Sequence, residues 1–81
     1  LDLFTTQQET MMLGMRLTKE GVSDFDFRDR FGAAIMDVFP KEVKRIIDNK
    51  LAEWRAFPDG PHLVLTRRGV LLGNQVFQEF V

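Results

Sequence analysis

Apolar residues recur at helical spacing over the first part of the chain. Thr6 and Glu9 have the spacing of a capping box, in which each side chain accepts a hydrogen bond from the other residue's backbone N–H at a helix start. This predicts a helix over residues 7–17, with Gly21 as a cap after its end. Its apolar stripe is expected to hold Met12, Leu13 and Leu17, with Met11 and Met15 beside it as core residues.

Two further helices follow from capping signals and apolar spacing. Ser23 has an acidic residue three positions later, which predicts a helix that ends at Gly32, with Phe27 and Phe31 in contact at i and i+4. Pro40 suits a first helical turn, so a third helix is predicted from about residue 39, or from residue 37, to residue 50. Its apolar stripe would be Val43, Ile46, Ile47 and Leu51.

The last third of the chain predicts a hairpin and a helix. Residues 53–57 and 62–65 flank a Pro-Asp-Gly-Pro turn, which predicts two antiparallel strands. Thr66 would cap a helix whose apolar positions are Leu72, Val76 and Phe80. Because glycine disfavours helix, at least one of Gly69 and Gly73 is expected to admit close contact with the hairpin or the first helix.

The order of these elements is helix, helix, helix, hairpin, helix. It predicts an α+β fold, mostly helical and winged-helix-like, with three helices, a β-hairpin and a C-terminal helix. A chain of 81 residues has room for one core. We expect residues 6–81 to form one domain and residues 1–5 to be a linker or the tail of a preceding domain. Because the chain starts at Leu1 rather than Met, we interpret it as a fragment of a longer protein.

The amino-acid composition limits the kinds of catalytic and metal sites that the chain could form. The chain has no cysteine, which excludes disulfides, iron–sulfur clusters, thiolate zinc sites and cysteine nucleophiles. His62 is the single histidine, so a two-histidine metal pair is impossible, and it is expected to lie at the surface of the turn. Asp24, Asp26 and Asp29 are expected to cap and solvate the second helix, because the glycine and distal glutamate of a calcium loop are missing. We therefore predict no catalytic, cofactor-binding or metal-binding residues and no enzymatic activity for this chain alone.

The apolar runs are short. Even the run from Val70 to Leu72 falls far below the roughly 18–20 residues that cross a bilayer, so no membrane partner is expected. The absence of cysteine fits a reducing compartment, and a cytoplasmic location is expected.

Several short blocks occur in an informative order. They are Glu9-x-Met-Met-Leu-Gly-x-Arg-Leu17, Gly21-Val-x-x-Phe25, Phe31-Gly32, Leu51, and Leu65-Thr-x-Arg-Gly69 through Asn74-x-Val76. From about residue 6 to residue 80 the chain resembles the C-terminal domain of the oxygen-independent coproporphyrinogen III oxidase family, which includes related heme chaperones. One departure is the Asn-Lys pair before Leu51, where the family commonly has glycine.

The resemblance implies an accessory domain that follows a radical S-adenosylmethionine barrel in porphyrin and heme metabolism. Such a barrel holds a 4Fe-4S cluster on a three-cysteine loop and binds S-adenosylmethionine. This chain has no such loop, so the resemblance implies no catalytic residue and no cofactor within it. Whether the longer protein is an oxidase or a heme chaperone stays open.

Four residues are candidates for contact with the barrel of the same chain. Glu9 and Arg16 are two helical turns apart, on the same side of the helix as Met12, and Phe57 would mark a contact if it is exposed. Arg16 could reach a carboxylate on the barrel or on a bound porphyrin. It could instead pair internally with Glu9, Glu20 or an aspartate, which is the favoured interpretation because half-buried charges are generally paired.

The alternative function is a winged-helix regulator that binds nucleic acid. The basic residues that could form such a surface are Lys41, Lys44, Arg45, Lys50, Arg67 and Arg68. However, Glu42, Asp48 and Glu53 interrupt them, and the net charge of −1 supplies no overall positive field. A solvated surface of mixed charge is favoured, and nucleic acid is not an expected partner.

Overall fold

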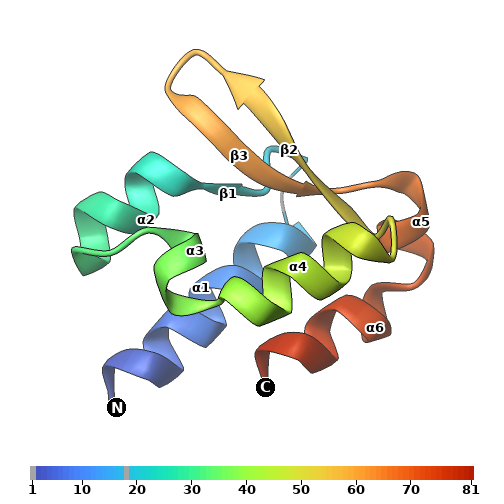
Figure 1. Cartoon of the computed structure of the whole chain (residues 1–81), viewed down its shortest axis with the longest axis horizontal. Helices are drawn as coiled ribbons and strands as arrows, with labels where there is room; N and C mark the ends of the chain where they lie inside the picture. The colour runs from blue at the N-terminus through green and yellow to red at the C-terminus, as the bar shows by residue number, and fades with distance from the viewer. Residues whose placement is uncertain (1, 18) are drawn as a thin grey trace.

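The computed structural model describes residues 2–17 and 19–81; Leu1, part of the expected linker, and Thr18 lie outside the described residues. Its elements are α1 (Leu3–Leu17), β1 (Val22–Ser23), α2 (Asp24–Phe31), α3 (Ile35–Val38), α4 (Pro40–Asp48), β2 (Ala52–Phe57), β3 (Gly60–Leu65), α5 (Arg67–Leu71), α6 (Gly73–Phe77) and a 3-10 helix, η1 (Gln78–Phe80). The helices pack on one side of a small sheet, and its hairpin extends beyond them (Figure 1). The predicted α+β, mostly helical class is confirmed.

β2 and β3 form the predicted antiparallel hairpin. Their pairing runs from Ala52 opposite Leu65 to Phe57 opposite Gly60, which leaves a two-residue turn at 58–59. Gly60 has a φ of 113°, a conformation that is accessible to glycine and disfavoured for other residues. The turn signal in the sequence therefore located the hairpin correctly.

The third strand, β1, was not predicted. It pairs with β3 through Val22 opposite Leu63 and Ser23 opposite His62, so the sheet order is β1-β3-β2. Gly21, with φ of 68°, precedes this strand, and a side chain there would overlap the backbone carbonyl of Leu63. Only glycine lets the two backbones approach so closely.

α1 begins four residues before its predicted start. The Asp2 carboxylate accepts a hydrogen bond of 2.7 Å from the backbone N–H of Thr5, as a helix-capping residue does. Thr6, expected as the cap, instead lies within the helix and donates its hydroxyl to the Asp2 carbonyl oxygen at 3.2 Å. Leu3–Thr5 thus form the first turn of α1. The assignment of residues 1–5 to a linker stays a prediction.

The buried stripe of α1 also differs from the predicted one. Its buried positions are Gln7, Met11 and Met15, at i, i+4 and i+8. Leu13 and Leu17, expected inside, are 54% and 69% exposed. The core assignment of Met11 and Met15 is confirmed, whereas the predicted stripe was wrong because a polar residue, Gln7, occupies its true first position.

α2 matches its sequence signals. The Ser23 hydroxyl accepts a 3.1 Å hydrogen bond from the Asp26 N–H, and Gly32 ends the helix in the left-handed conformation with φ of 74°. The rings of Phe27 and Phe31 lie 4.7 Å apart, as their spacing predicts.

The third predicted helix is two helices in the structure. α3 is four residues long, too short for a periodic signal, and it is held by side-chain caps. Asp24 accepts a hydrogen bond from the Ile35 N–H at 2.9 Å, and Asp37 accepts one from the Ala34 N–H at 3.0 Å. Phe39, at φ −126° and ψ 50°, separates α3 from α4, which ends at Asp48 rather than at residue 50.

The predicted C-terminal helix is also interrupted. The Thr66 hydroxyl accepts a 3.0 Å hydrogen bond from the Gly69 N–H, so the predicted cap of α5 is confirmed. Leu72 then leaves the helical region, at φ −115° and ψ 38°, and the chain continues as α6 and η1. The break turns α6 and η1 back across α1 and α4 (Figure 1).

The two glycines of this segment have different surroundings. A side chain on Gly69 would overlap the backbone carbonyl of Leu51, directly before the hairpin. A Cβ on Gly73 would meet only the Phe77 ring, at 3.2 Å. A close contact is therefore present at Gly69, but its partner is Leu51, directly before β2, rather than the hairpin or the first helix as expected.

The core lies between the helices and the sheet. An aromatic cluster forms its centre, in which the Phe39 ring lies 5.2 Å from Phe80 and 6.5 Å from Phe27. Fully buried aliphatic residues surround it: Met11, Ile35, Val43, Ile46, Leu51, Leu63 and Val76. This core fixes α1 against α6 and η1, which positions the surface described next.

Candidate docking surface

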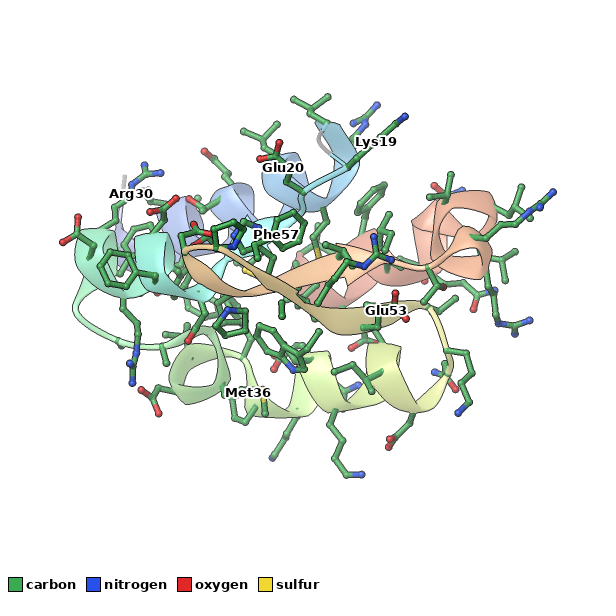
Figure 2. The ribbon with its side chains drawn as sticks, turned by 90° about the horizontal axis from the view of Figure 1, so that it is seen from above. Lys19, Glu20, Arg30, Met36, Glu53 and Phe57 are labelled. Carbon is green, nitrogen blue, oxygen red and sulfur yellow. The ribbon has the colours of Figure 1, made fainter. Side chains whose placement is uncertain are left out.

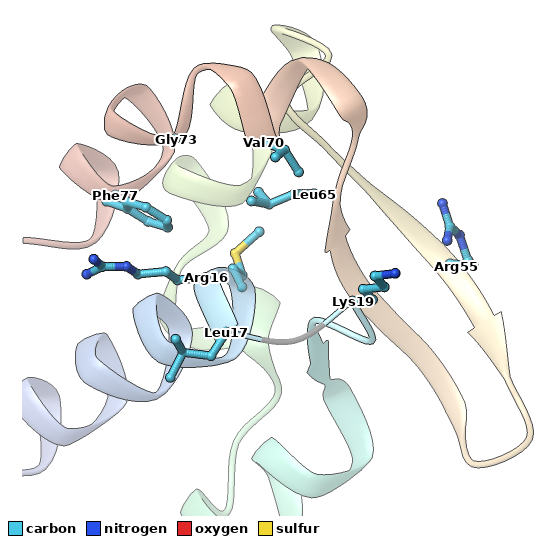
Figure 3. Close-up of a pocket in the computed structure, with 9 residues that line it drawn as sticks. Arg16, Leu17, Lys19, Arg55, Leu65, Val70, Gly73 and Phe77 are labelled. Atoms are coloured by element: carbon cyan, nitrogen blue, oxygen red, sulfur yellow. The ribbon is translucent and has the colours of Figure 1, made fainter.

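A hollow of about 540 Å³ opens between the end of α1, the end of β3 and the α5–α6 corner. Figure 3 shows Leu65 and Val70 above the end of α1, with Phe77 to one side. Apolar side chains line most of it: Met15, Leu17, Leu65, Val70 and Phe77. The remaining lining residues are Gly73 and three cations, Arg16, Lys19 and Arg55.

A second hollow of about 280 Å³ adjoins the first along α1. Glu9, Met12, Leu13, Arg16 and Phe77 line it, and the last two also line the first hollow. Three of the four predicted contact residues, Glu9, Met12 and Arg16, therefore meet at one place. Phe77, which the sequence analysis did not single out, joins the two hollows.

Leu17 and Val70 form an exposed apolar rim of the first hollow, and Leu71 follows Val70 in α5. Leu17 is 69% exposed, Val70 67% and Leu71 75%. We call the two hollows together with these three residues the α1–α6 surface. Large exposed apolar patches are rare on monomeric proteins, and where they occur they commonly mark interaction sites.

Arg16 has no hydrogen bond or ion pair with any described residue. The favoured internal pair with Glu9, Glu20 or an aspartate was therefore wrong: the side chain is exposed, so no desolvation demands a partner. Lys19 likewise has no partner among the described residues. Arg55 pairs with Glu53 of its own strand at 2.7 Å, and both side chains are about half exposed.

Phe57 lies apart from the other three candidates. It is half-buried near the hairpin turn, and its ring stacks on the His62 imidazole with centroids 4.0 Å apart. Figure 2 shows Phe57 over the sheet, with Lys19 and Met36 on opposite sides of the molecule. The structure thus does not bring Phe57 to the α1–α6 surface.

His62 is buried, so its predicted place at the surface of the turn was wrong. Its Nδ1 lies 2.8 Å from the Glu20 carbonyl oxygen and its Nε2 lies 2.7 Å from a carboxylate oxygen of Asp59. Both neighbours are acceptors, so the ring can donate to both of them only as an imidazolium. Burial alone would lower the pKa of His62, but these two hydrogen bonds and the nearby acids outweigh it and raise the pKa above 6.5. The hydrogen bond from His62 lowers the pKa of Asp59.

Two basic residues of α4, Lys44 and Arg45, pair with acidic residues of the same chain. Lys44 pairs with Asp48 at 2.8 Å, a contact whose hydrogen bond raises the pKa of Lys44. Arg45 pairs with Glu79 of η1, also at 2.8 Å. These pairs agree with the predicted solvated surface of mixed charge and leave little net positive field for nucleic acid.

Neither a metal cluster nor a membrane span is found in the part of the chain that the structure describes. No three His, Asp or Glu side chains there converge as metal ligands would. None of the described helices is both long and apolar enough to cross a bilayer.

Comparisons with known proteins identify relatives of this chain. The model of the HemN C-terminal domain family matches residues 7–72. The chain is 34% identical over 74 residues to the heme chaperone HemW of Bacillus subtilis (strain 168), covering 91% of this chain and 18% of that relative. It therefore spans less than a fifth of the relative's length. A search of solved structures found no match. From the extent of these matches, the chain belongs to the HemN C-terminal domain family.

Proposed function

We propose that this chain is the non-catalytic C-terminal accessory domain of a radical S-adenosylmethionine protein, either an oxygen-independent coproporphyrinogen III oxidase-like enzyme or a heme chaperone. In this proposal it packs on the catalytic barrel of the same polypeptide, in the cytoplasm. The observation that carries it is the family match over residues 7–72, since a domain of this family covers only 18% of the related heme chaperone.

The α1–α6 surface supports the packing step. Leu13 and Leu17 are exposed on α1 and Val70 is exposed on α5, and these apolar side chains would lose contact with water against a larger body. The surface has a recessed apolar centre and a charged periphery, as interfaces between domains commonly do. The match covers 18% of the relative, and the rest of that protein is large enough to supply such a body.

The chemistry would belong to the rest of the polypeptide. An iron–sulfur cluster of the kind proposed requires cysteine ligands, and this chain has none. The accessory domain would therefore influence the reaction by covering or orienting the barrel rather than through a side chain at the reacting atoms.

Two measurements test the proposal. The open reading frame upstream of Leu1 is first searched for a sequence that encodes a three-cysteine loop. Hydrogen exchange is then measured in the encoded polypeptide. We expect amides of α1 and α5–α6 to exchange more slowly in the complete encoded polypeptide than in the 81-residue chain. The double variant Leu13→Asp/Leu17→Asp should abolish this protection. The control Phe25→Asp, on a 62% exposed residue that lines neither hollow, should leave it intact. Equal exchange in both contexts would overturn the proposal.

A further inference from the structure

The first hollow has a segregated charge pattern. Its lining includes three cations and no carboxylate, although the whole chain carries 12 acidic and 11 basic residues. Figure 3 places Arg16 at the end beside Phe77, and Lys19 and Arg55 together at the opposite end, with Leu65 and Val70 between them. The cations therefore bracket an apolar centre.

Only one of the three cations has an acidic partner among the described residues. Glu53 pairs with Arg55 along the exposed strand, but Arg16 and Lys19 have no ion pair within the described residues. Glu9 lines the adjoining hollow beside Arg16 and forms no ion pair with it. Glu20 follows Lys19 in the chain, and its backbone carbonyl oxygen accepts a hydrogen bond from His62. Two cations thus stay available to an incoming anionic group.

We propose that this hollow binds an acidic peptide segment of the catalytic part of the same polypeptide, with an apolar side chain on Leu65, Val70 and Phe77 and carboxylates on Arg16 and Lys19. The inference rests on the proposed function and adds the chemistry of the partner segment. A guanidinium at one end and an ammonium at the other call for at least one carboxylate on each side of the apolar anchor.

The extent of the apolar area favours a polypeptide over a small ligand. A hollow of about 540 Å³ has the volume of a ligand pocket, but its lining residues Leu17 and Val70 are 69% and 67% exposed, and Leu71, next to Val70 in the chain, is 75% exposed. A small dicarboxylate would leave this rim in water. A protein segment carried on a larger body would cover the hollow and the rim together.

The shape and charge disfavour a bilayer and a nucleic acid. The apolar centre is recessed between α1 and the α5–α6 corner, where a flat lipid surface would not reach it. Three cations provide few phosphate contacts, and the net charge of −1 opposes attraction to a polyanion.

A titration of the ¹⁵N-labelled 81-residue chain tests the inference. The probe is a capped peptide with two glutamates on each side of a Leu-Phe pair, and its control carries glutamines instead. We expect amide shifts at the end of α1, the end of β3 and α5–α6, with affinity at least about tenfold weaker for the glutamine peptide. Arg16→Glu/Lys19→Glu should weaken binding of the acidic peptide by a similar factor.

A matched charge reversal controls for net charge. Lys41→Glu/Arg67→Glu replaces one lysine and one arginine that have no ion pair among the described residues and line neither hollow. It should leave affinity within about twofold of wild type. Equal binding of the two peptides, or shifts outside the hollow, would overturn the inference. So would tighter binding to phosphatidylserine vesicles or to a DNA duplex than to the acidic peptide.

Exchange in the complete polypeptide separates this inference from the proposed function. If Leu13→Asp/Leu17→Asp removes the protection and Arg16→Glu/Lys19→Glu does not, the proposed accessory role stands. The inference that an acidic segment binds the hollow is then wrong. If the wild-type complete polypeptide shows no protection, the proposed packing is wrong, and peptide binding would then assign the hollow to a segment of another protein, contrary to the inference. If both double variants lose the protection that the wild type shows, and the acidic peptide binds more tightly than the glutamine peptide, the proposed function and the inference are both supported.

Discussion

Two sides of the molecule differ in how their charged and apolar groups are satisfied. One side is formed by α4 and η1, and the other is the α1–α6 surface. On α4, Lys44 and Arg45 pair with acids of the same chain, and the underlying apolar residues are buried. On the α1–α6 surface, Arg16 has no partner among the described residues and Leu17 is 69% exposed. Apart from Lys41, the side formed by α4 and η1 is complete within 81 residues, whereas the α1–α6 surface presents groups that a partner would satisfy. The following predictions test that difference, from the largest effect to the smallest.

Truncating a core ring on the complete side should have the largest effect. Phe39 is 1% exposed and contacts the rings of Phe4, Phe27 and Phe80. Phe39→Ala should lower the free energy of unfolding by about 3–5 kcal/mol. Leu17→Ala, on the α1–α6 surface, should change it by no more than about 0.5 kcal/mol in the isolated chain. Urea unfolding followed by circular dichroism measures both. A large loss in Leu17→Ala would mean that the surface is part of the domain's own core.

The glycine contact should have the next largest effect. In Gly69→Ala the new methyl group meets the Leu51 carbonyl, and the displaced backbone should cost about 1–3 kcal/mol. This loss should appear even though alanine improves helix propensity by about 1 kcal/mol. The control is Gly73→Ala, where only the movable Phe77 ring is near and a change within about 0.5 kcal/mol is expected. Equal urea midpoints for the two variants would contradict the assignment of the close contact to Gly69.

The His62 site should make stability depend on pH. The pKa of His62 is raised above 6.5 in the folded chain, so its contribution is fully present below pH 6.5 and is lost as pH rises through the raised pKa. The pKa of Asp59 is lowered below 3.8, so its contribution is present above 3.8 and is lost as pH falls through the lowered pKa. The melting temperature should therefore fall on the alkaline side of pH 6.5. His62→Gln should remove most of this dependence, and an unchanged slope would show that another group causes it.

The smallest effect concerns single surface charges. Arg45→Ala breaks its 2.8 Å pair with Glu79 between α4 and η1 and should cost about 0.2–1 kcal/mol, less at high salt. Arg16→Ala loses no such pair and should cost less than Arg45→Ala in the isolated chain. The ranking should reverse in the complete polypeptide, where the proposed partner is present. Thermal melts of both variants in both contexts provide the comparison.

Local signals predicted much of the fold. The Ser23 and Thr66 caps, the Gly32 stop and the hairpin turn each act within about four residues, so their meaning can be read from the sequence. The errors in α1 came from competition between similar local signals. Asp2 and Thr6 both offer a capping side chain, and Gln7 gives the true buried stripe a polar first position.

The parts that were missed depend on distant contacts. β1 has two residues, and its identity as a strand rests on pairing with residues about 40 positions later. His62 is buried because the backbone oxygen of Glu20 lies against it, a partner that no side-chain pattern reveals. At the candidate site, helical spacing was enough to predict that Glu9, Met12 and Arg16 lie together on one helix. It was not enough to place Phe77, because the position of that residue depends on the break at Leu72.

The sheet order has a consequence for the behaviour of the chain during synthesis. In the order β1-β3-β2, β2 pairs on one side only among the described residues, so its outer backbone groups form an edge that could template aggregation. That edge is six residues long, carries Glu53 and Arg55 with opposite charges, and is followed directly by Pro58, which has no N–H to donate. Short length, charge and proline are the features that discourage a second chain from adding a strand. The exposed hairpin is thus protected from unwanted pairing by its own sequence, even before any partner covers the rest of the domain.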